Sequence, residues 1–500
     1  MIVEDSLKKR YGIKLLANVI SAIIGAVLVA IVPKALGPIQ YGQFVYLQDF
    51  FMKIISFLDM GSSTAFFTKL SARHTRKELI TFYFFYSSAV LISVLLFIFA
   101  ISAIGFSKTF LPDIPNQYIY LGLFFGFFTW LTQIFIMISD AYALTVSVEL
   151  IKIGHKIVSL LLLLYFVYFT AFELDTYFYY HYIALSLFLT VIGWLFVKKG
   201  ILDQQVITLN FSFKKVSKEF IQYCYPLISY NLVGILTGLF DIWLLQMMAG
   251  SEQMGFYGLS YSLAAICFLF TGAMTPIITR EFSKSYERKD IEQMRKLFYR
   301  FIPMLYSLAA YFAIFISFQS ENVLAIFTDE KFKEAYWVLV IMAFYPIHQT
   351  YGQLSGSIFY ATGQTRLYKN IGNISSIIGL LLSLLFIYSL ELGAIGLAVK
   401  MVLTQLIIVT AQLYYNSKFL GLNLIYFFSH QLYTLLFFLF LSFVASNIIT
   451  LETSLGTFLI SGVIYTLLVI IFVYIFPQIF ATTKDEIKKY LTKILYGIKK

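Results

Sequence analysis

The sequence predicts an all-α polytopic membrane protein with about 14 transmembrane helices. Of its 500 residues, 60% are hydrophobic and only 13% are charged, about half the charged fraction of an ordinary soluble domain. Apolar runs of about 20 residues recur from end to end, and each is long enough to cross a hydrocarbon core about 30 Å thick. These runs must be helices, because barrel strands are only about 10 residues long and alternate in polarity.

The basic residues orient these runs. Of the 37 lysines and arginines, two lie well inside predicted spans (Lys53 and Lys400), and only four fall in loops on the side opposite the N-terminus (Lys34, Lys108, Lys331 and Lys333). Because basic loops stay on the cytoplasmic side, we expect a multi-pass protein with both termini cytoplasmic. This bias and anionic lipid account for the net charge of +11, so no nucleic-acid partner is expected. The predicted spans are 13–33, 43–66, 79–104, 117–138, 154–172, 178–197, 222–248, 255–278, 299–318, 335–359, 370–389, 394–415, 430–449 and 456–477.

One short motif, G-x-x-Q-x-G-x-[FY], occurs twice at an offset of 213 residues. Each copy falls in the tight outer turn after an odd-numbered span, and Asn18 and Asn231 match at the same offset, as do Lys156 and Lys369. This indicates two parallel-repeat six-helix lobes, a common transporter layout, although chance similarity of Gly-rich turns is the alternative. The motif itself is expected to be structural, since glycine permits sharp turns and close helix contact. Its predicted residues are Gly37, Gln40 and Gly42 in the first copy, and Gly250, Gln253 and Gly255 in the second.

Three longer segments resemble a known family. They are "PKALGPIQYGQF" after the first span, "YPLISYNLVGILTGLFDIWLL" followed by "GSEQMGFYG", and "YATGQTRLYKNIGNISSIIGLLLSLLFIYSLELGAIGLAVKMV". With the span count, they make the chain similar to the Wzx-type O-antigen and capsule repeat-unit flippases. This polysaccharide transporter family belongs to the multidrug/oligosaccharidyl-lipid/polysaccharide (MOP) exporter superfamily. The lipid II flippases and the MATE-like drug/cation antiporters share its architecture.

The resemblance implies a domain layout and a function. The implied parts are an N-lobe at 1–200, a cytoplasmic basic linker at 201–221, a C-lobe at 222–416, two further helices within 417–480, and a cytoplasmic basic tail at 481–500. The implied activity is translocation of undecaprenyl-diphosphate-linked oligosaccharide to the outer leaflet of a bacterial inner membrane by alternating access. Polysaccharide polymerase and chain-length partners are implied by the family alone.

Charged residues inside spans are costly and mark candidate functional sites. Given the implied substrate, Lys53 and Lys400 are candidates for binding the diphosphate or sugar acids. Asp49, Asp59 and Asp241 are candidates for coupling to H⁺ or Na⁺. The alternative is that Asp49 and Lys53, which are four residues apart, form a self-satisfied pair, and that Asp241 serves packing between the lobes.

A second set of basic residues lies near the inner ends of the spans. These side chains could ring the inner mouth and collect diphosphate, or they could simply set topology by snorkelling. The candidates are Lys14, Lys152, Lys156 and Arg366.

Two rival classes remain. A membrane polymerase or ligase is expected to carry a large outer loop, and the longest outer loops here are short. The sequence contains no phosphate-binding G-x-x-x-x-G-K, no H-E-x-x-H and no metal-spaced His/Cys cluster, so we expect neither an enzyme nor a cofactor. A drug/cation antiporter should bind its substrate through buried acids without cavity lysines, and Lys53 and Lys400 argue against that class.

Overall fold

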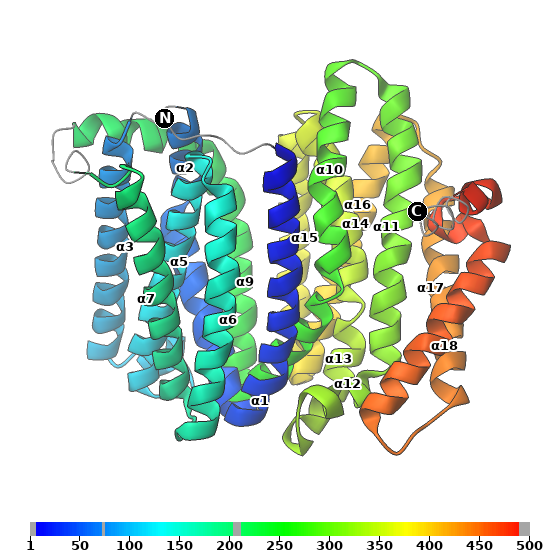
Figure 1. Ribbon diagram of the computed structural model, residues 1–500, viewed down its shortest axis with the longest axis horizontal. Helices are drawn as coiled ribbons and strands as arrows, with labels where there is room; N and C mark the ends of the chain where they lie inside the picture. Colours follow the sequence, from blue (N-terminus) through cyan, green and yellow to red (C-terminus); the bar gives the residue numbers. More distant parts are fainter. Residues whose placement is uncertain (1–6, 73–75, 204–211, 490–500) are drawn as a thin grey trace. The chain divides into compact units, whose positions relative to one another are not determined.

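The computed structural model describes residues 7–72, 76–203 and 212–489, and all of its regular elements in these ranges are helical (Figure 1). The chain forms two compact units, one up to Gly255 and one from Phe256 onward. The first contains α1 (Leu7–Asp59), α2 (Ser62–Ala72), α3 (Glu78–Ala103), α4 (Ser107–Phe110), α5 (Asn116–Ala141), α6 (Thr145–Phe169), α7 (Leu174–Lys198) and most of α9 (Phe213–Ala265). The second contains α10 (Phe268–Glu287), α11 (Ile291–Phe318), α12 (Ser320–Phe327), η1 (Glu330–Ala335), α13 (Tyr336–Met342), α14 (Tyr345–Ala361), α15 (Thr365–Ser383), η2 (Leu384–Ser389), α16 (Gly393–Leu420), α17 (Leu424–Ile448), α18 (Ser454–Ile475) and η3 (Pro477–Phe480).

The described residues contain 11 helices that are long and apolar enough to cross a membrane. Two of them, α1 and α9, are each interrupted by a non-helical glycine. The first predicted span and most of the second fall within α1, and the seventh and most of the eighth fall within α9 and α10. The tenth predicted span is divided between α13 and α14. An all-helical, multi-pass membrane fold is therefore confirmed, although the tenth predicted span and part of the eighth lie on helices outside these 11.

The order of helices repeats along the chain. Helices α3 and α11 begin at Glu78 and Ile291, 213 residues apart, and α4 and α12 begin at Ser107 and Ser320, at the same offset. Helices α6 and α15 begin at Thr145 and Thr365, where the offset is 220. The shift arises where continuous α5 is matched by the broken series η1, α13 and α14. The repeat predicted from the short motif therefore extends over whole helices.

The longer offset changes one sequence match. Ala143 and Gly363, which are 220 residues apart, both have positive φ, at 57° and 72°, immediately before α6 and α15. At this offset Lys369 corresponds to Glu149. The match of Lys156 to Lys369 at 213 was therefore wrong, because the intervening helices differ in length.

The two copies of the glycine motif pack directly against each other. Gly37 and Gly250 break α1 and α9 with the same backbone conformation, φ 72°, ψ 171° and φ 77°, ψ −178°. A Cβ added at Gly42 would lie 1.7 Å from the carbonyl oxygen of Ser251, and one added at Gly255 would lie 2.2 Å from that of Pro38. Only glycine permits so close a backbone approach. We call this reciprocal contact the glycine junction, and it explains why the motif occurs twice.

The segment between α4 and α5 is held beside the glycine junction. Gln43 donates a hydrogen bond to the carbonyl oxygen of Asp113 at 3.2 Å. Gln246 donates to the carbonyl oxygen of Pro112 at 3.1 Å and to Ser251 Oγ at 2.7 Å. Side chains of both α1 and α9 therefore fix this segment.

The second unit is built around α11. Its core includes Tyr306, Tyr351 and Tyr465, all fully buried. Helix α18 packs on α11 through Tyr465, whose ring lies 5.0 Å from those of Tyr311 and Phe315. In Figure 1, α17 and α18 lie on the side of this unit next to α11, and α17 shares the same core. The last two helices are thus an integral part of this unit.

Two basic segments of the sequence belong to long helices. Residues 279–298 end α10 and begin α11, and Asp290 between them is the N-cap of α11. Residues 213–221 of the predicted linker form the first turns of α9, while 204–211 lie outside the described residues. Helix length exceeds the apolar run in both places because polar residues continue a helix readily once it leaves the membrane. Most of the predicted tail, 490–500, also lies outside the described residues, and the domain boundaries stay predictions.

Candidate functional site

Lys53 and Asp49 form an ion pair one helical turn apart on α1. Lys53 Nζ lies 3.0 Å from Asp49 Oδ2, and the side chains are 27% and 44% exposed. The stem of Lys53 lies against α9, because a Cβ added at Gly238 would be 2.9 Å from Lys53 Cε. Asp49 and Lys53 therefore do form the local ion pair that the sequence offered as an alternative. Lys53 also contacts the α9 segment that carries Asp241.

Asp241 lies on α9, three residues after Gly238, and is 6% exposed. Three residues are almost one helical turn, so Gly238 and Asp241 lie on neighbouring parts of one helix face. The structure thus places two of the predicted coupling acids and Lys53 in the same α1–α9 region of the first unit. Their roles in transport stay predictions.

Asp59 ends α1 and accepts hydrogen bonds from the start of α2. Its carboxylate accepts from Ser62 Oγ at 2.7 Å, and from Ser63 N and Oγ at 3.1 and 2.8 Å. Tyr83 Oη donates a fourth bond at 2.8 Å. The bond from Ser63 N satisfies a backbone donor in the first turn of α2, as an N-cap side chain does, although Asp59 lies three residues before that helix. A structural role for Asp59 therefore has direct support, and its predicted ion-coupling role remains untested.

Lys400 lies in the second unit on α16 and is 6% exposed. A Cβ added at Gly379 of α15 would be 3.2 Å from Lys400 Cε, so this glycine leaves room for the lysine stem. A buried lysine is costly unless its charge is used or balanced. Lys400 also makes an interaction in the structure, and its role in binding stays a prediction.

The inner-side basic candidates occupy different settings. Lys152 pairs with Glu149 on α6 at 2.9 Å, and Glu149 is almost fully buried. Lys156 follows one turn later on α6 and is half-buried, whereas Arg366 is exposed in the first turn of α15. Lys14 lies within α1, but its side chain is outside the described residues. Lys152 and Lys156 therefore share one helix, and the ring formed by the four residues stays a prediction.

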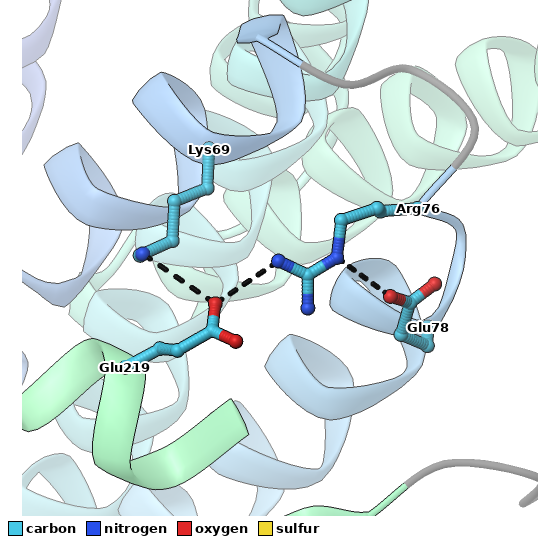
Figure 2. A network of polar contacts seen from close by, with 4 residues as sticks. All are labelled: Lys69, Arg76, Glu78 and Glu219. Atoms are coloured by element: carbon cyan, nitrogen blue, oxygen red, sulfur yellow. Dashed lines mark hydrogen bonds and ion pairs between the residues drawn. The ribbon is translucent and has the colours of Figure 1, made fainter. Parts of the chain in front are cut away.

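A polar network that the sequence did not single out connects α2, the α2–α3 segment and α9 (Figure 2). Arg76 Nη1 lies 3.0 Å from Glu219 Oε2, and Lys69 Nζ lies 3.6 Å from the same oxygen. Arg76 Nε donates to Glu78 Oε1 at 2.7 Å. Nearby, Lys77 pairs with Asp203 and donates to the carbonyl oxygen of Gly200. The signal in the sequence was that Asp203 and Glu219 are the acids of an otherwise basic segment.

This network shifts the titration of its members. The hydrogen bond to Glu78 and then the pairing with Glu219 raise the pKa of Arg76 above its ordinary value. The hydrogen bond from Arg76, with the charges of Arg76 and Lys69, lowers the pKa of Glu219 below its ordinary value. Both groups are therefore held in their charged forms.

No metal site is found in the part of the chain that the structure describes. No group of three or more His, Cys, Asp or Glu residues there is placed to hold a metal ion. The site chemistry of the described residues consists of charged pairs, buried charged side chains and hydrogen-bonding groups.

The arrangement of helices is one that solved membrane transporters share. Its fold is similar to that of the lipid II flippase MurJ in an inward closed conformation, with a TM-score of 0.72, 13% identity, and coverage of 92% of this chain and 98% of that chain. It is also similar to an inward-facing multidrug resistance MATE family transporter of the MOP superfamily, with a TM-score of 0.60, 14% identity, and coverage of 84% and 96%. These likenesses confirm the expected MOP fold and, at such identities, the fold alone.

The family follows from the sequence match. The family described as "Polysaccharide biosynthesis protein" matches residues 7–282, more than half of the chain, and the chain belongs to this family. A relative, the probable low-salt glycan biosynthesis flippase Agl15 of Haloferax volcanii, is 25% identical over 224 residues. That match covers 44% of this chain and 47% of the relative, so the chain spans about half the length of this curated relative.

Proposed function

We propose that this protein is a flippase that moves a lipid-linked oligosaccharide across the membrane by alternating access. The observation that carries the proposal is membership of the polysaccharide biosynthesis protein family over residues 7–282, joined to a fold shared with a lipid II flippase over 92% of the chain. A relative with a flippase name supports the same reading.

The finer form of the proposal concerns the substrate and its route. The substrate is an undecaprenyl-diphosphate-linked repeat unit, which moves from the cytoplasmic to the outer leaflet of a bacterial inner membrane. Its destination is O-antigen, capsule or exopolysaccharide, where a polymerase and a chain-length regulator would act next. Lys53 and Lys400 supply positive charge inside spans for the diphosphate or sugar acids. Asp49 and Asp241 lie in the α1–α9 region, where H⁺ or Na⁺ could couple to transport.

The second candidate is a drug/cation antiporter of the same fold. The buried acids Asp59 and Asp241 are the observation that favours it, because such antiporters bind cations through acids. Lys53, which lies beside Asp49 at 3.0 Å, offsets the negative charge of that region and favours an anionic substrate.

Reconstitution separates the two candidates. The purified protein is placed in vesicles that carry a polyprenyl-diphosphate-linked oligosaccharide in one leaflet, and a membrane-impermeant glycosidase reports the fraction on the outer face. We expect protein-dependent transfer between leaflets. Vesicles with protein that leave the glycan in its original leaflet, but that exchange an organic cation for H⁺ or Na⁺, would support the antiporter.

A further inference from the structure

Two cations converge on one carboxylate oxygen in the network of Figure 2. Arg76 Nη1 approaches Glu219 Oε2 at 3.0 Å, a normal hydrogen-bond distance, while Lys69 Nζ remains 3.6 Å from the same atom. The longer distance is an ion pair without a hydrogen bond. A single negative charge therefore faces two positive charges and satisfies only one of them fully.

The first turns of α9 are firmly placed, so the position of Glu219 is a built feature. Phe220, its neighbour, packs against Phe82 of α3 with ring centroids 4.9 Å apart, and Phe213 packs against the same ring at 5.1 Å. Tyr223 Oη lies 3.4 Å from Thr68 Oγ1 of α2. These contacts present Glu219 to the two cations.

Both cations keep capacity for a second ligand. An arginine has five N–H donors and a lysine has three, and the bonds of Arg76 within the described residues occupy its Nε and Nη1. The side chains of Lys69, Arg76 and Glu219 are 24%, 22% and 27% exposed, so solvent reaches them. They lie among the basic loops, on the side that the charge bias predicts to be cytoplasmic.

We propose that Lys69 and Arg76 form a docking site for the diphosphate of the substrate, and that Glu219 occupies this site until the diphosphate displaces it. A diphosphate has two phosphoryl groups and more than one negative charge, so it can bridge both cations where the carboxylate cannot. Displacement also removes an ion-pair tie between α9 and the α2–α3 segment. This inference rests on the proposed function, because it takes the lipid-linked diphosphate as substrate.

The test compares binding by full-length variants in nanodiscs, with inorganic pyrophosphate as the probe. Glu219→Gln removes the competing charge and keeps the side-chain size, so we expect pyrophosphate affinity to rise by roughly three- to tenfold. Arg76→Gln should lower it by a similar factor. The matched control is Glu486→Gln, because Glu486 forms another long-range pair, with Arg300 at 2.7 Å, and should leave affinity unchanged.

Each alternative outcome overturns a stated part of the inference. Equal affinity in the Glu219→Gln and Glu486→Gln variants means that the network is only a structural tie. Glu219→Gln could raise the affinity of the protein for phosphatidylglycerol vesicles as much as its affinity for vesicles that contain polyprenyl diphosphate. In that case the site binds lipid phosphate in general, and the diphosphate assignment fails. Transport by the wild-type protein is measured in parallel. Normal transport without these affinity changes refutes the docking site, whereas the affinity changes without any transport refute the proposed function alone.

Discussion

The glycine junction gives the sharpest structural prediction. In a Gly42→Ala variant the new Cβ would lie 1.7 Å from the backbone oxygen of Ser251, and in a Gly255→Ala variant 2.2 Å from that of Pro38. Real Cβ atoms essentially never approach closer than 3.0 Å, so the backbones must separate by roughly an ångström. Overpacking of a well-packed contact lowers the free energy of unfolding by about 1–3 kcal/mol. We expect both variants at the upper end of this range, because the clashing atoms belong to the backbone and cannot rotate away as a side chain can.

The assay is thermal unfolding of the purified variants in detergent, with controls on the same two helices. No atom lies within 4 Å of a Cβ added at Gly25 of α1 or Gly234 of α9, so alanine there should be neutral or stabilising by about 0.5–1 kcal/mol. The double Gly42→Ala, Gly255→Ala variant should lose less than the sum of the single losses, because both substitutions strain one contact. Single variants that melt like the Gly25 and Gly234 controls would refute the close approach.

Three further predictions concern the charged residues. Asp59→Ala should cost about 1–2 kcal/mol of stability through the lost cap of α2, measured as a lower melting temperature, whereas Asp49→Ala should change it little; equal melting would contradict the capping role. Lys53→Ala should lower glycan transfer in vesicles at least roughly tenfold while the melting temperature hardly changes, since exposed helix pairs contribute only about 0.3–0.5 kcal/mol; full transfer would remove Lys53 from the site. Arg76 holds the pKa of Glu219 below its ordinary value of 4.5, so the stability that Glu219 contributes is complete above about pH 4.5 and is lost as the pH falls through the lower folded value. The melting difference between wild type and Glu219→Gln should therefore vanish in acid, and a difference that grows there would contradict the assigned pairing.

The helical fold was predictable because its cause is local. A run such as 456–477 is apolar along its whole length, and within a membrane such a run must satisfy its backbone by forming a helix. The role of glycine in the motif was equally predictable. Gly37 and Gly250 adopt positive φ, a backbone conformation that other residues adopt only at a cost, so a break at these positions requires glycine. Its purpose as a mutual contact needed the structure, since no sequence pattern states that Gly42 faces Gly255.

The charged network could not be derived from the sequence because its partners are far apart in the chain. Arg76 and Glu219 are separated by 143 residues, and each looks like an ordinary loop charge by itself. Asp59 was visible as a charge within a span, but its cap role depends on where α1 ends, and apolar content does not mark that point. Conversely, Lys53 and Asp49 were paired correctly from their spacing alone, because residues four apart share a helix face.

The central claim is tested most directly in the source cell with this gene deleted. Polyprenyl-diphosphate-linked glycans are extracted, and their distribution between the two membrane faces is measured together with surface polysaccharide. The proposed flippase predicts that single repeat units accumulate on the inner face, that surface polymer is lost, and that the gene restores both. Repeat units that still reach the outer face in the deletion strain would contradict it.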